Sequence, residues 1–337
     1  MHLDKHLFNE AYLMHSSTSP QYAIIASCDV AAAMMEPPGG TALVEESIKE
    51  ALEFRRAMRK VDKEFGKDWW FKVWGPDKLV EEGIGRAEGW TLKAKDKWHG
   101  FGDLAPGFNL LDPIKCTIIT PGMDMSGKFA KTGIPAGIVT KFLAEHGVVV
   151  EKTGLYSFFI LFTIGITKGR WNTLLTALQQ FKDDYDRNAP MWRILPEFCQ
   201  AHARYEKMGL RDLCLTMHEA YAKGDIARLT TDMYLSDLQP AMKPSDAFAH
   251  IARRETERVD IDKLEGRITT ALLTPYPPGI PLLIPGERFN RKIVQYLKFT
   301  REFNAGFPGF ATDVHGLVAD EGGAEGRYYV DCVRDRV

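Results

Sequence analysis

The sequence predicts a mixed α/β protein in which a small two-layer α+β domain adjoins a mostly helical C-terminal domain. Length is the first observation, because 337 residues exceed what one hydrophobic core usually serves, so we expect about two domains. The second is the order strand, helix, strand, strand, helix between residues 114 and 185, which is typical of a split-βαβ layer. The third is composition: 45% apolar and 26% charged residues are ordinary for a well-cored globular protein.

Charge, targeting signals and cysteines exclude several classes of function. The 43 Lys and Arg residues nearly balance the 45 Asp and Glu residues, which argues against a nucleic-acid partner or a polybasic membrane anchor. The uncharged, apolar stretch from Thr153 to Thr167 is too short for a bilayer, which requires about 20 apolar residues. No secretory signal opens the chain, so we expect a cytoplasmic protein. The five cysteines show no metal-ligand spacing and are expected to be mostly buried free thiols.

The first 65 residues are predicted to be helical, and a Trp- and Gly-rich stretch follows them. A first helical segment breaks at Ser16 to Pro20, and an apolar helix then runs from Gln21 to Met35. Pro37-Pro38-Gly39-Gly40 ends that helix. A long amphipathic helix is expected from about Ala42 to Phe65. Residues 66–112 contain short strand-like pieces.

The small domain is predicted from cleaner patterns. Ile114 to Thr120 is a β-branched run and is expected to form a buried strand. Pro135 to His146 is a helix that Gly147 ends. Two further strands, Val148–Glu151 and Tyr156–Thr167, precede an amphipathic helix from Arg170 to Tyr185.

The C-terminal region is predicted to be largely helical. Residues 190–270 carry helix starts at Asp212 and at Ser245, the latter as an N-cap. A rigid loop spans Pro275 to Pro281, a helix runs from about Arg291 to Phe303, and a hairpin lies around Tyr328 to Val333.

Three local patterns imitate ligand-binding motifs and are explained more simply. Gly122 to Lys128 matches most of a phosphate-binding P-loop, but Phe129 stands where a Ser or Thr should bind Mg²⁺, which favours an ordinary turn. The Gly-rich stretch at residues 83–89 is one residue too long for a dinucleotide loop. Asp246 and His250 provide too few ligands for a catalytic metal, so we expect no metal site.

Two features remain open between a structural and a functional interpretation. Ser17-Thr18-Ser19-Pro20 precedes a helix without acidic residues in its first turn; it is either an ordinary cap or an anion site. Glu151 ends an apolar run just before a turn; it either points into water or meets a cationic ligand.

Several longer segments resemble the bacterial biodegradative ornithine/lysine/arginine decarboxylases, which are pyridoxal-phosphate enzymes of fold type I. The resemblance covers nearly the whole chain but only the later part of the family's chain. The matching segments keep the family's order; they are Asn9-Glu10-Ala11-Tyr12-Leu13-Met14-His15-Ser16-Ser17-Thr18-Ser19-Pro20-Gln21-Tyr22, Leu111-Asp112-Pro113-Ile114-Lys115, Thr120-Pro121-Gly122-Met123, Gly133-Ile134-Pro135-Ala136, Pro275-Tyr276-Pro277-Pro278-Gly279-Ile280-Pro281 and Phe307-Pro308-Gly309-Phe310.

The resemblance implies a three-part organisation. Residues 1–112 are expected to be the end of a pyridoxal-phosphate-binding large domain with a linker. Residues 113–188 form the α+β small domain, and residues 189–337 form the C-terminal domain.

The resemblance also implies site roles. Thr18 and Ser19 match family positions that help to hold the phosphate of pyridoxal phosphate across a dimer interface, which decides the first open feature in favour of the anion site. Val150-Glu151-Lys152-Thr153-Gly154 is more similar to the lysine-specific members, where the glutamate lies near the distal ammonium of the substrate. A single carboxylate suits an ammonium, whereas a guanidinium favours a bidentate partner. Lysine, ornithine and arginine all stay open as substrates.

The family's cofactor lysine lies in a Ser-x-His-Lys-like stretch, and these 337 residues contain none. We therefore expect the C-terminal portion of a decarboxylase that belongs to a homo-oligomer, at least a dimer, with no catalytic residue of its own and no activity alone. The alternative is a non-catalytic, truncated homologue that binds or regulates a full-length decarboxylase.

Overall fold

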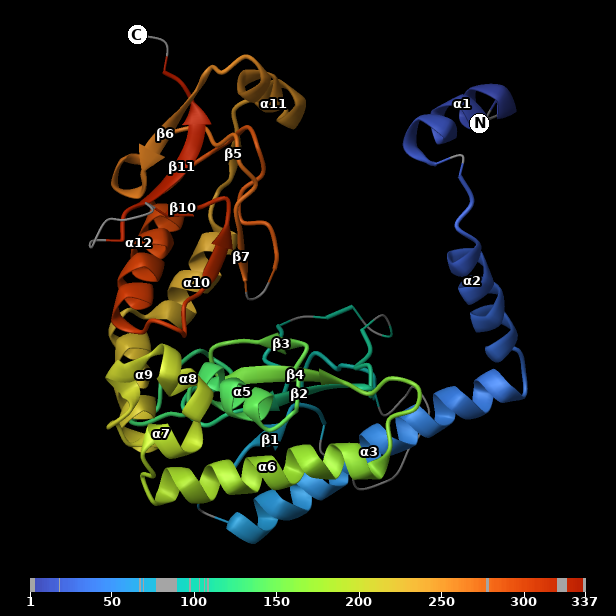
Figure 1. Cartoon of the computed structure of the whole chain (residues 1–337), viewed down its shortest axis with the longest axis vertical. Coiled ribbons are helices and arrows are strands. Elements are labelled where there is room, and N and C mark those ends of the chain that lie inside the picture. The colour runs from blue at the N-terminus through green and yellow to red at the C-terminus, as the bar shows by residue number, and fades with distance from the viewer. Residues whose placement is uncertain are drawn as a thin grey trace.

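The chain forms a U in which an N-terminal helical arm and a C-terminal region rise from a shared base (Figure 1). The computed structural model describes residues 4–17, 19–66, 68, 70–76, 90–96, 98–102, 104–105, 107, 109–276, 279–319 and 326–335. The base contains a four-stranded sheet and long helices, so the molecule is mixed α/β, as the sequence predicts.

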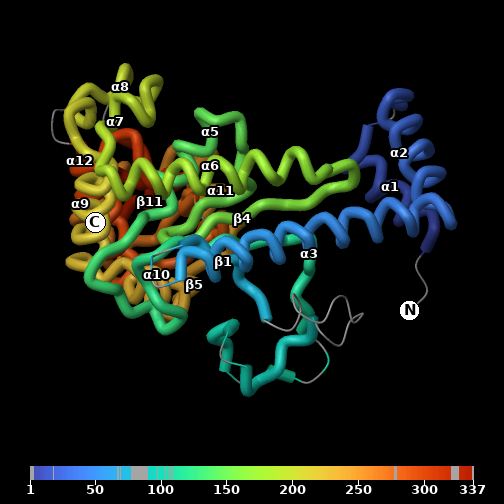
Figure 2. The backbone as a smooth tube through the Cα atoms, turned by 90° about the horizontal axis from the view of Figure 1, so that it is seen from below, coloured from blue at the N-terminus to red at the C-terminus, as the bar shows by residue number. Residues whose placement is uncertain are grey.

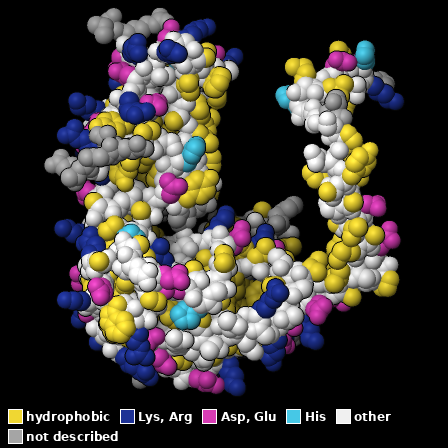
Figure 3. All heavy atoms as spheres, viewed as in Figure 1, with side chains coloured by type: hydrophobic (Ala, Val, Ile, Leu, Met, Phe, Trp, Pro, Cys, Tyr) yellow, Lys and Arg dark blue, Asp and Glu magenta, His cyan; other side chains and the backbone are white. Residues whose placement is uncertain are grey.

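The arm consists of α1 (Lys5–His15) and α2 (Tyr22–Met34). Asp4 caps α1, since its carboxylate accepts a hydrogen bond of 2.8 Å from the backbone N–H of His6. Neither helix has a buried residue, although α2 is apolar over most of its length. Apolar side chains therefore lie exposed along the whole arm (Figure 3). The predicted break at residues 16–20 and the helix end before Pro37 are both confirmed.

The long helix α3 (Gly39–Phe65) joins the arm to the base and begins three residues earlier than expected. Its second half buries Phe54 and Met58 in the main core, whereas Leu52 packs in a separate cluster with Leu92 and Leu111. Arg55, 2% exposed, donates a hydrogen bond of 2.8 Å to the carbonyl of Trp74 and one of 3.0 Å to that of Lys115. Because a buried guanidinium needs such acceptors, these bonds fix the helix against the strand edge.

The sheet is antiparallel throughout, in the order β1 (Lys72–Val73), β2 (Lys115–Ile119), β4 (Ser157–Leu161) and β3 (Lys152–Thr153). One face is covered by α5 (Ala136–Glu145), α6 (Lys168–Asp186) and α3 (Figure 2). Cys116, Ile118 and Phe158 point to the helices and are buried. Because side chains alternate along a strand, Thr117, Ile119 and Ser157 lie on the other face. The predicted strand–helix–strand–strand–helix order is confirmed.

One predicted strand is wrong. Val148 to Glu151 is not a strand, and the edge strand β3 begins only at Lys152. After α5 ends, Val148 and Val150 are partly buried and pack against the hydrophobic core, whereas Val149 is 88% exposed. Only the backbone N–H of Glu151 reaches the neighbouring strand, donating 2.8 Å to the carbonyl of Phe159. The apolar run therefore belongs to the connection between α5 and β3 and does not pair with a neighbouring strand.

The helical region follows α6. Its short elements are α7 (Met191–Ile194), α8 (Pro196–Ala201) and a 3₁₀ turn at Ala203–Tyr205; α9 (Leu210–Lys223) and α10 (Ile226–Leu235) are longer. α10 packs on α12 (Arg291–Gly306), which Asn290 caps by accepting from the backbone N–H of Ile293 at 3.0 Å. The helix expected from Arg291 is confirmed and extends three residues further.

Small sheets complete the C-terminal region. The largest has the order β10 (Val318–Ala319), β11 (Tyr328–Val333) and β6 (Thr256–Asp260), with the 3₁₀ turn Ile261–Lys263 after β6; the two-stranded sheets pair β5 (Gln239–Pro240) with β8 (Glu287–Arg288), and β7 (Thr274–Tyr276) with β9 (Asp313–His315). Helix α11 (Pro244–Ala252) begins one residue before the predicted cap. Lys243 is its N-cap, because Pro244 occupies the first turn and Ser245 is already helical.

Candidate functional site

The predicted phosphate-binding segment lies in the arm, between α1 and α2. Thr18 falls outside the described residues, whereas Ser19 is exposed and its backbone N–H donates 3.1 Å to the hydroxyl of Ser17. Gln21 is the N-cap of α2 and provides no side-chain hydrogen bond. The backbone N–H groups of Tyr22, Ala23 and Ile24 therefore donate to no described residue. Free N–H groups beside hydroxyls, with no acidic residue in the first turn, can bind an anion.

Glu151 lies in the turn before β3, at the edge of the sheet. Its side chain is exposed and makes no ion pair or hydrogen bond with the described residues. The carboxylate is consequently available to a cation from solution. The structure does not bring Glu151 and Ser19 together, since the arm stands away from the sheet (Figure 1).

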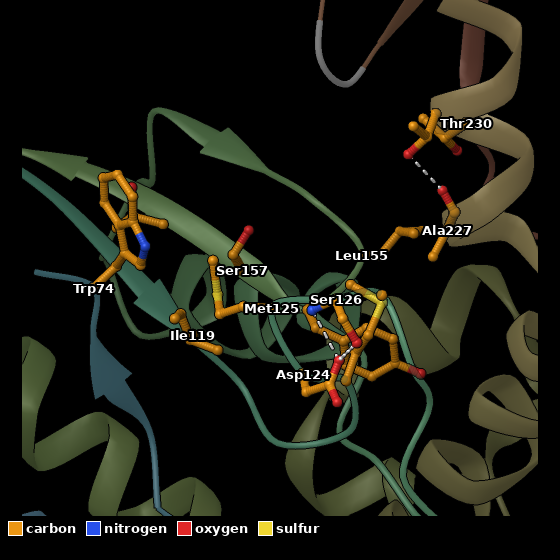
Figure 4. Close-up of a pocket in the computed structure, with 14 residues that line it drawn as sticks. Trp74, Ile119, Asp124, Met125, Ser126, Leu155, Ser157, Ala227 and Thr230 are labelled. Carbon is orange, nitrogen blue, oxygen red and sulfur yellow. Dashed lines mark hydrogen bonds between the residues drawn. The ribbon is translucent and has the colours of Figure 1, made fainter. Parts of the chain in front are cut away.

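A pocket of about 570 Å³ opens over the uncovered face of the sheet, between the strands and α10 (Figure 4). Its lining combines residues of the sheet, the turn after β2 and α10: Trp74, Thr117, Ile119, Met123, Asp124, Met125, Ser126, Gly127, Leu155, Tyr156, Ser157, Ala227, Thr230 and Thr231. Apolar side chains with a few polar groups are typical of small-molecule sites. Neither Glu151 nor Ser19 belongs to this lining.

The turn after β2 is held by Asp124. Its Oδ1 atom accepts hydrogen bonds from the hydroxyl and the backbone N–H of Ser126, at 2.6 and 2.9 Å, and from the backbone N–H of Lys128 at 3.0 Å. The Ser126 hydroxyl, assisted by the Lys128 N–H and cation, holds the pKa of Asp124 below its ordinary value. The prediction that residues 122–128 form a turn and not a P-loop is confirmed.

A buried polar chain supports the back of the pocket. The hydroxyl of Tyr156 lies 2.5 Å from Nδ1 of His218, and Nε2 of His218 lies 2.9 Å from the carbonyl oxygen of Ala130. A carbonyl can only accept, so His218 donates from Nε2 and accepts the Tyr156 proton at Nδ1. Burial raises the pKa of Tyr156, which keeps its hydroxyl protonated.

Sequence reasoning missed the residues of this pocket. Tyr156 was expected only as the first residue of a strand, and His218 carried no motif. The sequence signal that could have pointed to these hydrogen bonds is the pair of glycines Gly122 and Gly133. A Cβ would collide with Tyr156 at the first position and with His218 at the second. Gly122 also has φ +137°, a conformation that favours glycine.

The described residues contain neither a candidate metal-binding group nor a helix that could span a membrane. No group of three potential metal ligands occurs among the described residues. Within the same residues, no helix is long and apolar enough to cross a bilayer.

Two sequence profiles of one protein family match the chain. The profile described as "Orn/Lys/Arg decarboxylase, major domain" matches residues 1–170, and the one described as "Orn/Lys/Arg decarboxylase, C-terminal domain" matches residues 227–334. Together they cover most of the chain.

Individual relatives agree with these profiles. A lysine decarboxylase of Pseudomonas aeruginosa is 50% identical, covering 99% of this chain and 45% of the relative. The inducible lysine decarboxylase of Escherichia coli K12 is 38% identical, covering 99% of this chain and 46% of the relative. The solved structure of lysine decarboxylase A from Pseudomonas aeruginosa superposes with a TM-score of 0.93 at 50% identity, covering 99% of this chain and 45% of that chain. This chain thus spans about half the length of the relatives it matches.

Proposed function

The chain belongs to the Orn/Lys/Arg decarboxylase family, and from that premise we propose that it is the C-terminal portion of a pyridoxal-phosphate-dependent lysine decarboxylase. The reaction converts a basic amino acid into the corresponding amine and CO₂. The observation that carries the proposal is the 50% identity to a lysine decarboxylase over 99% of this chain. The biodegradative branch of the family is part of the proposal.

Three parts are proposed for the chain, with residues 1–112 completing a cofactor-binding domain, residues 113–188 forming the small domain and residues 189–337 the C-terminal domain. In support, residues 113–188 contain the four-stranded sheet except for β1. They also contain the two helices α5 and α6, which cover one face of that sheet.

The start of α2 fits the phosphate end of pyridoxal phosphate. Thr18 and Ser19 would hold that phosphate, together with the N–H groups of Tyr22 and Ala23, which donate to no residue that the structure describes. When bound, pyridoxal phosphate supplies an electron sink for the loss of CO₂. The covalent attachment requires a lysine that these 337 residues do not provide in a Ser-x-His-Lys-like setting. We therefore assign no catalytic residue to this chain.

Glu151 is proposed to recognise the distal end of the substrate. Its carboxylate is exposed, has no partner among the described residues and stands at the edge of the sheet. A point-charge ammonium suits one carboxylate better than a guanidinium does, which favours lysine or ornithine over arginine. Such a contact aligns the amino acid so that its carboxylate, at the other end, reaches the reaction centre.

The proposed state is a homo-oligomer, at least a dimer, with the active site shared between subunits. The arm supports this, since neither α1 nor α2 buries a residue in the single chain. Exposed apolar surface of this extent is typical of an interaction site.

A segment exchange tests the proposed activity. The matched segment of the Pseudomonas aeruginosa lysine decarboxylase is replaced by these 337 residues, and CO₂ release is measured with lysine, ornithine and arginine. We expect activity that is highest with lysine, and none from the 337 residues alone with added pyridoxal phosphate. A folded chimera that is inactive on all three amino acids would contradict the proposal.

The second candidate is a non-catalytic homologue that binds or regulates a full-length decarboxylase. The exposed arm is the observation that favours it, because an unpaired apolar surface can dock on a related subunit. The chain is mixed with the intact Pseudomonas aeruginosa enzyme and sedimentation is measured. A mixed species with altered activity supports this candidate, and independent sedimentation rejects it.

A further inference from the structure

The pocket over the open face of the sheet has no role in the proposed function so far. It is about 570 Å³ in volume, which is in the range that small-molecule ligands occupy. Its walls come from three elements distant in sequence: the end of β1, the turn after β2, and α10 (Figure 4).

The apolar wall centres on Trp74. The indole N–H donates 3.1 Å to the carbonyl of Trp98, and the ring of Trp98 packs edge-on against it at 4.9 Å between centroids. These contacts fix the indole at the pocket margin. Ile119, Met125 and Leu155 extend the apolar lining. A methylene chain would replace water on this apolar surface, which favours its binding.

The floor is polar but uncharged. Thr117 and Ser157 lie on the same face of the paired strands β2 and β4. Neither hydroxyl forms a hydrogen bond with a described residue, so both can serve a ligand as donor or acceptor. Thr230 and Thr231 donate to the carbonyls of Ile226 and Ala227, leaving their oxygen lone pairs as acceptors toward the pocket.

Charge selects the class of ligand. Asp124 is the one charged residue among the described residues that line the pocket, so the lining contains a carboxylate and no cation. Its Oδ1 accepts all three hydrogen bonds of the turn, and Oδ2 accepts none from the described part of the chain. The carboxylate is ionised at neutral pH, as an aspartate with an ordinary or lowered pKa is, and the hydrogen bonds of the turn lower that pKa. A carboxylate with one oxygen free of hydrogen bonds from the described residues, in a lining that also contains an indole ring, favours an organic cation and disfavours an anion.

We propose that this pocket binds a linear aliphatic amine, with its ammonium group on Oδ2 of Asp124 and its methylene chain against Trp74. The inference rests on the proposed function in one respect: decarboxylation of a basic amino acid releases such an amine. The hydroxyls of Thr117 and Ser157 are then available for hydrogen bonds to the other end of the bound amine.

Calorimetric titration of the full 337-residue chain with 1,5-diaminopentane tests the proposal. We expect saturable binding, and at least tenfold weaker binding of 1,5-pentanediol, which has the same chain without charge. Equal affinity for the diol would overturn the role of Asp124, and no binding of the diamine would overturn the proposal as a whole.

Two variants localise the site. Asp124→Asn keeps the oxygen acceptor of the turn but removes the charge, and we expect at least fivefold weaker diamine binding. Asp246→Asn, on α11 and outside the pocket lining, is the matched control and should bind as the unmodified chain does. Circular dichroism confirms folding of both. Equal loss in the two variants, or no loss in Asp124→Asn, would refute the site.

The outcome is separable from that of the proposed function. Binding is measured without cofactor and without turnover, so a chain that supports no decarboxylation can still bind the diamine. Conversely, an active chimera whose diamine affinity is unaffected by Asp124→Asn would retain the proposed function and reject this pocket.

Discussion

The hydroxyl of Tyr156 and Nδ1 of His218 are joined by a 2.5 Å hydrogen bond between residues that are 3% and 2% exposed. The bond connects the start of β4 with the middle of α9, 62 residues away. His218 in turn donates to the carbonyl of Ala130, so one imidazole joins the sheet, the turn after β2 and the helical region. The back of the pocket is therefore fixed by tertiary structure.

Removing this hydroxyl should destabilise the protein. Tyr156→Phe leaves Nδ1 of His218 buried without a donor, and we expect a loss of about 1–3 kcal/mol in the free energy of unfolding. Tyr185→Phe is the control, because Tyr185 is also a buried residue but its hydroxyl forms no hydrogen bond with the described residues. Urea unfolding measures both; equal losses would contradict the role of the Tyr156–His218 bond.

Gly133 should not tolerate a side chain. A Cβ at this position would collide with Nδ1 of His218 and with the Cα of Gly122, so Gly133→Ala is expected to cost about 1–3 kcal/mol of stability. Gly137 lies in α5, and a Cβ added there would meet no neighbouring atom within 4 Å outside the helix's own backbone, so Gly137→Ala should be neutral or slightly stabilising. Thermal unfolding of the two variants compares them directly. A stability order opposite to this one would refute the packing.

The five cysteine thiols should differ in reactivity according to their exposure to solvent. Cys28 is exposed, whereas Cys116, Cys199, Cys214 and Cys332 are buried. Burial raises the pKa of Cys116 to about 11, which keeps it protonated and unreactive at neutral pH. We expect one thiol to react rapidly with Ellman's reagent in the native chain and none in Cys28→Ser. Fast labelling of two or more thiols in the native chain would disagree with the buried positions.

Acid should remove one stabilising contact at the surface of the C-terminal region. Hydrogen bonds from Arg301 and Lys298 lower the pKa of Asp262 from 3.8 to about 2. Because the folded pKa is lower than the unfolded one, the contribution is complete above about pH 4 and disappears as the pH falls toward 2.

The Asp262 contribution is measured as the stability difference between the unmodified chain and Asp262→Asn. We expect a difference of about 1 kcal/mol or less near pH 5, since the side chain is 48% exposed and water screens the pair. The difference should shrink as the pH falls to 3. A constant difference between pH 5 and 3 would show that Asp262 acts through something other than its charge.

The elements that the sequence predicted best are those with local signals. The helix beginning at Arg291 follows the cap residue Asn290, and the helix after Pro135 ends before Gly147, which has φ +75°. The predictions were wrong where tertiary contacts determine the secondary structure. Val148 to Glu151 has a strand's composition, but only Glu151 reaches β4, so pairing there depends on the position of α5.

The pocket could not be predicted because its parts are distant in the sequence. Trp74, Asp124 and Thr230 have no shared motif, and only the folded sheet and α10 bring them around one cavity. The predicted site residues stood out in local sequence features instead, and a family resemblance then suggested their roles. Ser19 and Glu151 are accessible for their proposed roles and stay proposals, as does Thr18, which lies outside the described residues.

The substrate contact of Glu151 is the most direct test of the account. In the chimera with the Pseudomonas aeruginosa enzyme, we compare Glu151→Gln with Glu197→Gln, an exposed glutamate in the first turn of α8. We measure kcat/KM for lysine and expect Glu151→Gln to lower it by at least tenfold, mainly through KM, because an ammonium loses its charged partner. Glu197→Gln should match the unmodified chimera. A chimera in which Glu151→Gln leaves kcat/KM for lysine unchanged would contradict the account.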